Sequence, residues 1–150
     1  MVELITVMVV LGIISAVAIP RLMGNDMAGP AFRAELVSAL RYAQKTAVSH
    51  RRLVCATLTP ASPYTTVALT IATSNQTAAC PNTLTLPDGS VSYASKDAAT
   101  TATSALANPL YFQPAGTITS NAGGTAIVSG TIAISGQTAI AIEGATGYVE

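Results

Sequence analysis

The stretch MVELITVMVVLGIISAVAIP, residues 1–20, decides the architecture of this chain. Residues 4–19 carry no charged side chain, and a single carboxylate, Glu3, directly precedes them. As a helix these residues extend about 24 Å, somewhat less than the roughly 30 Å hydrocarbon core of a bilayer. No basic segment precedes the run and no small-residue cleavage site follows it, which is unlike a secretory signal peptide. We expect residues 1–20 to form an apolar helix that anchors the chain in a membrane or drives its assembly.

Glu3 is the residue of this stretch that needs an explanation. An unpaired carboxylate in an apolar layer is costly and usually marks a functional site. The alternative is an acid in the first turn of a helix, which interacts favourably with the helix dipole. We favour a functional role, because a helix end buried in a membrane does not need that interaction.

The composition limits which partners the chain can bind. It is 50% hydrophobic and only 9% charged, with a formal net charge of zero, so no bulk electrostatic partner is implied. Six of the seven basic residues precede residue 53: Arg21, Arg33, Arg41, Lys45, Arg51 and Arg52. After residue 53 only Lys96 accompanies the acids Asp88, Asp97, Glu143 and Glu150. This asymmetry predicts either attraction between a basic helix and an acidic domain, within or between subunits, or simply a solvated helix face.

A second helix is expected after a turn-rich break. The segment MGNDMAGP, residues 23–30, is rich in turn formers and interrupts the first helix. From near Ala31 to near His50, six apolar residues recur at helical spacing: Phe32, Leu36, Ala39, Leu40, Ala43 and Ala47. The chain therefore divides into an apolar helix over 1–20, an amphipathic helix over 21–51 and a domain over 52–150.

The domain over 52–150 is predicted to be built of short strands. Runs of β-branched and aromatic residues between turn formers predict strands at 52–59, 64–72, 91–95, 110–113, 125–129, 131–135, 138–142 and 147–150. Turns are expected at 60–63, 87–89 and 135–137, the last within a hairpin. One long helical segment followed by many strands indicates an α+β fold, with the helix packed on an antiparallel sheet.

No catalytic constellation is present in the sequence. The single histidine, His50, stands between Ser49 and two arginines, and the acids are scattered. Gly123-Gly124 lacks the lysine that a phosphate-binding loop requires. We therefore expect no enzymatic activity, no cofactor and no metal site.

Two groups of residues carry a resemblance to a known superfamily. VELITVMVVLGIISAVAIPRL, with Glu3, Gly12, Pro20 and Arg21, looks like the N-terminal segment of type IV pilins and of type II secretion pseudopilins. Residues 34–58, the sequence YFQPAGTI at 111–118 and the closing ATGYVE are similar to the H-type pseudopilin. They also resemble minor pilins of mannose-sensitive haemagglutinin pili and a DNA-uptake minor pilin. The likeness covers 2–58 and 110–150, whereas the Thr/Ala/Ser-rich residues 60–105 match nothing known to us.

The resemblance implies an architecture and a life cycle. The long N-terminal helix, apolar first and amphipathic later, would pack on an antiparallel β-sandwich, and Phe112–Gly116 would supply a core side chain and then a turn. The chain would lie in the bacterial inner membrane and then join copies of itself or related pilins in an extracellular helical filament. A prepilin peptidase and the pilus assembly machinery would act on it, and its N-terminal residue would be methylated. The family's glutamate stands two residues further along than Glu3, which predicts two residues before Met1.

The resemblance also assigns roles to residues of the first helix. Glu3 would pair with the N-terminal amine of a neighbouring subunit and set the register between them, the best-attested use of a buried ion pair. Gly12 and Pro20 both weaken a helix. We expect the stretch between them to lose helicity in a filament, and the alternative is a continuous helix with a proline kink.

Exported proteins commonly form disulfides and carry glycans. The even cysteine count therefore predicts a bond between Cys55 and Cys80. Asn75-Gln76-Thr77 fits the N-glycosylation pattern, although it is otherwise a plain polar loop.

Three functions compete at this point. The leading expectation is a structural subunit of a type IV pilus-like filament. The first alternative is a low-abundance minor pilin or pseudopilin that primes assembly or forms the tip. A DNA-binding uptake pilin is disfavoured, because only Arg51 and Arg52 offer a basic patch.

Overall fold

Two helices precede all the strands. Helix α1 spans Val2–Met23 and α2 spans Ala28–His50. The computed structural model describes residues 2–23, 27–61 and 63–150, except for the side chains of 17–23. The expected turn-rich break includes residues 24–26, which lie outside the described residues. Helix α2 begins earlier than the predicted Ala31, because Pro30 falls in its first turn, where a missing amide hydrogen is tolerated.

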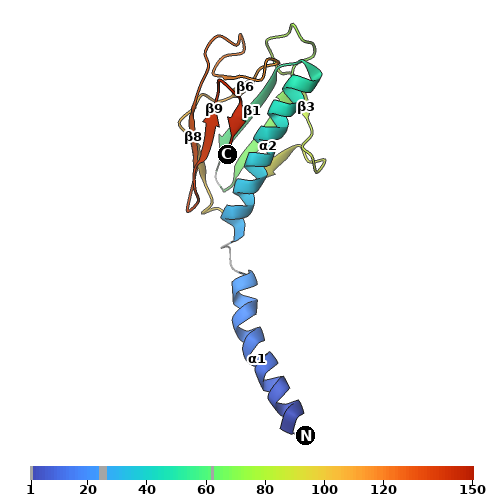
Figure 1. Ribbon diagram of the computed structural model, residues 1–150, viewed down its shortest axis with the longest axis vertical. Coiled ribbons are helices and arrows are strands. Elements are labelled where there is room, and N and C mark those ends of the chain that lie inside the picture. Colours follow the sequence, from blue (N-terminus) through green and yellow to red (C-terminus); the bar gives the residue numbers. More distant parts are fainter. Residues whose placement is uncertain (1, 24–26, 62) are drawn as a thin grey trace.

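The strands form two antiparallel sheets. They are β1 (Val54–Pro60), β2 (Thr65–Ile71), β3 (Asn82–Leu84), β4 (Ser92–Ala94), β5 (Ala102–Ser104), β6 (Leu110–Phe112), β7 (Ile118–Thr119), β8 (Gly130–Ile134), β9 (Ile140–Glu143) and β10 (Tyr148–Val149). One sheet has the order β3-β2-β1-β6-β7, with β4 also paired to β2, and the other has the order β10-β9-β8-β5. Helix α2 lies against both sheets and crosses in front of β1 in Figure 1. The predicted α+β class is confirmed.

The core lies between α2 and the two sheets. All six apolar residues predicted on one face of α2 are buried, none more than 1% exposed. They pack with Val54 and Leu69 of the first sheet and with Ile132 and Ile140 of the second. Phe112 is also buried, and the chain turns directly after it at Gly116, whose φ is +92°. The expected role of the Phe112–Gly116 element is therefore confirmed.

The prediction of a strand over 125–129 was wrong. Only an isolated bridge from Ile127 to Thr119 forms there, and Ile127 is exposed. The Asn121 side chain explains the difference, because its Oδ1 accepts hydrogen bonds from the amides of Thr125 and Ala126. Those amides are then unavailable to a strand ladder. Strands β3, β5 and β7 were not predicted.

Helix α1 extends away from the β-sheets (Figure 1). It is helical through both Gly12 and Pro20 in the single chain. Among the residues that the structure describes, no helix combines the length and the apolarity needed to cross a membrane.

Candidate functional site

The most unusual surface of this protein is helix α1. Every side chain described between Val2 and Ala16 is exposed, and its large apolar side chains are between 53% and 76% exposed. A helix that is apolar on all sides is normally buried in a protein or a membrane. An exposed apolar surface of this extent marks an interaction site. Helix α1 therefore needs a partner surface outside its own chain.

Three predicted assembly residues lie on α1. Glu3 is exposed in the first turn, and its main-chain carbonyl accepts a hydrogen bond from the Thr6 hydroxyl at 2.8 Å. Nothing lies within 4 Å of the position that a Cβ on Gly12 would occupy. Pro20 is part of the helix, with its side chain outside the described set. The three residues lie along one helix and do not converge on a single site.

The predicted disulfide is present. Cys55 of β1 is bonded to Cys80, which precedes β3. Cys55 is 5% exposed and lies in a small apolar cluster with Leu53 and Ala72, separate from the main core. The bond ties the β2–β3 connection to the central strand of the first sheet. In the loop-entropy model, closing a loop of this length contributes about 3 kcal/mol.

Asn75 lies in an exposed turn between β2 and β3. The Thr77 hydroxyl, which the glycosylation pattern requires, hydrogen-bonds to the Ser74 hydroxyl at 2.8 Å. Asn75 itself is exposed, and its glycosylation stays a prediction.

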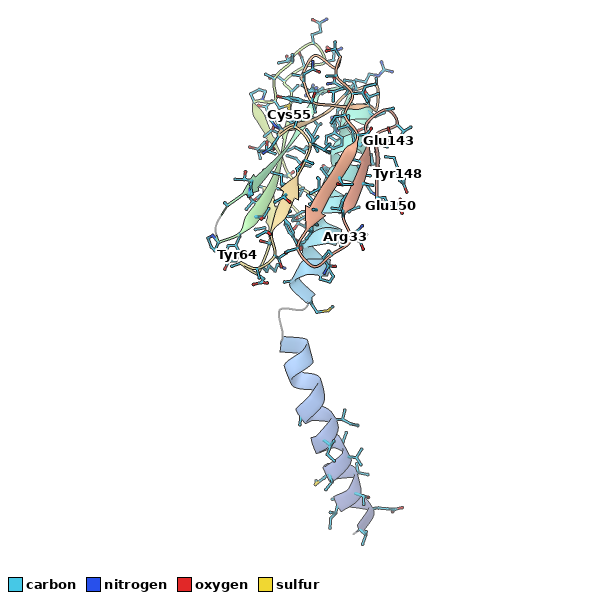
Figure 2. The ribbon with its side chains drawn as sticks, turned by 90° about the vertical axis from the view of Figure 1, so that its left-hand side faces the viewer. Arg33, Cys55, Tyr64, Glu143, Tyr148 and Glu150 are labelled. Atoms are coloured by element: carbon cyan, nitrogen blue, oxygen red, sulfur yellow. A yellow bond between two sulfur atoms is a disulfide. The ribbon has the colours of Figure 1, made fainter. Side chains whose placement is uncertain are left out.

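Two arginines of α2 bind main-chain oxygens of the second sheet and of its β8–β9 turn, not carboxylates. Arg33 donates from Nε to the carbonyl of Thr138 at 2.8 Å, and Arg41 donates from Nε to the carbonyl of Val149 at 2.9 Å. Figure 2 shows Arg33 on α2 near the end of the domain that lies towards α1. The expected attraction between helix and domain thus includes charge-assisted hydrogen bonds to peptide groups.

Within the described parts of the chain there is one salt bridge, and its polarity is the reverse of the predicted one. The amine of Lys96, in the β domain, lies 4.0 Å from Oε1 of Glu35 on α2. The Lys96 side chain is 81% exposed, so solvent weakens this pair.

Glu35 belongs to a surface depression that we call the tyrosine pocket. Its walls come from α2, the turn before β2 and the segment around β4, and include Glu35, Tyr64, Asp88, Tyr93 and Lys96. Tyr64 is 45% exposed, and Figure 2 places it at the end of the domain nearest α1. Two phenol rings and two carboxylates in one hollow suit a cationic group.

The charges of the tyrosine pocket act on one another. The Ser90 hydroxyl and main-chain amide donate to Oδ1 of Asp88 at 2.7 and 2.9 Å, and they hold the pKa of that carboxyl below its ordinary value. Partial burial raises the pKa of the Tyr93 hydroxyl, and the negative charges of Asp88 and Glu35 raise it further. Sequence reasoning missed this pocket, because its residues are far apart in the chain and follow no motif.

A basic surface lies at the opposite end of α2. We call it the basic cap, and it consists of His50, Arg51 and Arg52. Arg51 ends the helix in the left-handed conformation, with φ of 52°, and its amide donates to the carbonyl of Val48. No acidic residue occurs between residues 36 and 87 of the sequence. Within the described segments, neither Arg51 nor Arg52 has a carboxylate within 4 Å.

The comparison with known protein families covers nearly the whole β domain. The family model for type II transport protein GspH matches residues 34–146, which includes residues 60–105 that resembled nothing by themselves. No curated protein and no solved structure matches the chain. The matched residues comprise most of α2 and nearly all of both sheets. The chain therefore belongs to the GspH family, the H-type pseudopilins of the type IV pilin superfamily.

Proposed function

We propose that this protein is a structural subunit of a type IV pilus-like extracellular filament and that it polymerises through α1. The observation that carries the proposal is the exposure of every described side chain on an apolar helix. Its family is one of structural subunits assembled at the cell envelope, which fits this use of α1. Before assembly, α1 would reside in the bacterial inner membrane, where the prepilin peptidase would act on the chain.

Glu3 would set the register between neighbouring subunits. In the filament its carboxylate would pair with the N-terminal amine of another subunit inside an apolar core. A buried charge is tolerable when it is paired and costly when it is not. Gly12 and Pro20 would let the helix between them extend or melt once the subunits pack together.

The description of the matched family as a type II transport protein favours a second candidate, a pseudopilin of a secretion filament. Such a subunit would be of low abundance and would prime assembly or form the tip. The two candidates differ in copy number. Quantitative mass spectrometry of sheared filaments measures that number. If this chain is present at one copy or fewer per hundreds of subunits, it is not the main subunit.

The Glu3→Ala and Glu3→Gln variants test the assembly role itself. Both are expected to leave the Cys55–Cys80 disulfide and the β domain intact, because Glu3 is exposed and remote from the core. Both are also expected to abolish incorporation into filaments, since the register contact is lost. Glu143→Gln, at an exposed position of β9, is the matched control and should incorporate normally. Normal filaments from the Glu3 variants would contradict the pairing.

A further inference from the structure

The two ends of the β domain carry opposite chemistry. The tyrosine pocket holds the carboxylates of Glu35 and Asp88 beside Tyr64 and Tyr93, and its Tyr64 lies at the end nearest α1 (Figure 2). The basic cap lies at the end of α2 that is furthest from α1 (Figure 1). Glu35 and Arg51 lie on the same helical path, 16 residues apart by number, which corresponds to about 24 Å of helix. The two surfaces therefore cannot meet within one molecule.

We propose that the basic cap of one copy docks into the tyrosine pocket of a second copy. This inference rests on the proposed function and names the surface through which the β domains of neighbouring subunits meet. A contact between two different surfaces of identical chains generates an open helical polymer when its rotation does not close into a ring. The basic cap at one end of each subunit would then face the acidic tyrosine pocket at the other end of the next subunit.

The chemistry of the pocket matches an arginine. A guanidinium group donates to carboxylates in a fixed fork and stacks on aromatic rings, which suits the two carboxylates and two phenol rings of the pocket. The Lys96 amine is the cation already near the pocket, yet it reaches only Oε1 of Glu35 and lies mostly in solvent. An incoming arginine would displace it at little cost.

A second copy is the occupant that the charges favour. The basic cap has an exposed histidine and Arg51, and Val48 beside it is 46% exposed. An acidic surface with aromatic rings is the complement of such a cap, and the same chain carries one at its other end. Electrostatic complementarity of this kind selects the partner and its orientation.

Cysteine cross-linking in filaments tests the contact. Ser49→Cys places a thiol beside the basic cap, and Ala94→Cys places one on the wall of the pocket. The native cysteines are bonded to each other and do not compete. A full-length chain with both changes is expected to give a ladder of covalent dimers, trimers and longer multimers on oxidation. Each single change should give monomers, and Ser49→Cys with Thr131→Cys, on an exposed position of β8, is the matched control.

The outcomes separate this inference from the proposed function. If the unmodified chain is absent from filaments, both fail. If the double variant is incorporated but forms no ladder, only the docking contact is wrong. A cross-link to a chain of different mass would show that the pocket binds another protein, which also overturns the inference.

Charge reversal provides a second test that needs no cysteine. Glu35→Arg and Arg51→Glu are each expected to lower filament incorporation roughly tenfold, because each places like charges across the contact. A chain carrying both changes should recover incorporation, since the pair is restored with opposite polarity. Failure of the combined variant to exceed either single variant would overturn the inference.

Discussion

Arg41 of α2 donates a hydrogen bond from Nε to the main-chain carbonyl of Val149, 108 residues later in the chain. Val149 is 2% exposed and lies in β10. The next residue, Glu150, forms two main-chain hydrogen bonds with Ala141, one in each direction. The arginine therefore joins the helix to the outer edge of the second sheet. Because β10 is an edge strand, no neighbouring strand of the described residues donates to the Val149 carbonyl, and Arg41 supplies that hydrogen bond instead.

Arg41→Ala is expected to lower the free energy of unfolding by about 1.5 kcal/mol, the low end for a hydrogen bond from a charged donor, because Arg41 is exposed. The effect should be local, so hydrogen exchange at the amides of Ala141 and Glu150, which bond to each other's carbonyls, should accelerate more than exchange in β1. Lys45→Ala, a neighbouring exposed cation on the same helix, is the control and should leave both measurements unchanged. Equal loss of protection throughout the domain would contradict a capping role for Arg41.

The sequence predicted those parts of the fold that depend on local patterns. The apolar stripe from Phe32 to Ala47 has the helical period, and it is the face that α2 buries. The Cys55–Cys80 bond followed from cysteine count and the expected export. The tyrosine pocket was not predictable, because β4 brings Tyr93 beside Val67 only through the register of β2 and β4. The side-chain bonds of Asn121 were also invisible to a pattern of β-branched residues.

Removal of the disulfide should destabilise the domain without changing its core. Replacement of both Cys55 and Cys80 by serine is expected to cost about 3 kcal/mol, because the unfolded chain regains the freedom of the closed loop. Urea unfolding of the oxidised chain and of the double variant measures the difference. A reductant should destabilise the unmodified chain and leave the variant unaffected. Equal stability of the oxidised and reduced chain would argue against a stabilising bridge.

The hydrogen bonds from Ser90 should be visible in the titration of Asp88. Ser90→Ala removes the hydroxyl donor at 2.7 Å but keeps the main-chain amide, so the pKa of Asp88 is expected to rise towards its ordinary value of 3.8. Nuclear magnetic resonance of the Asp88 carboxyl carbon follows this change directly. Ser92→Ala, which alters another wall residue of the same pocket, is the control and should leave that pKa in place.

The lowered pKa of Asp88 also predicts how the stability of the fold changes with pH. Because folding lowers the pKa of Asp88, its ionised form stabilises the fold at any pH above the ordinary value of 3.8. This contribution is lost as the pH falls from 3.8 through the lowered pKa. The Ser90→Ala variant should therefore differ from the unmodified chain at neutral pH and approach it in acid. A difference that grows on acidification would contradict the assignment.

Substitutions at Gly147 and Gly136 separate the cost of close packing from the cost of a left-handed backbone conformation. Both glycines have positive φ, +71° for Gly147 and +69° for Gly136. A Cβ on Gly147 would overlap the carbonyl oxygen of Gly116 and Nε2 of Gln44. A Cβ on Gly136 would have no atom of the described residues within 4 Å. Gly136→Ala should therefore cost about 1 kcal/mol, the penalty of the left-handed conformation alone. Gly147→Ala should cost at least about 3 kcal/mol, because the main chain at Gly116 must move away from the new Cβ, although the Gln44 side chain can turn aside. Thermal unfolding compares the two, and equal losses would show that the approach of Gly147 to Gly116 is not restrictive.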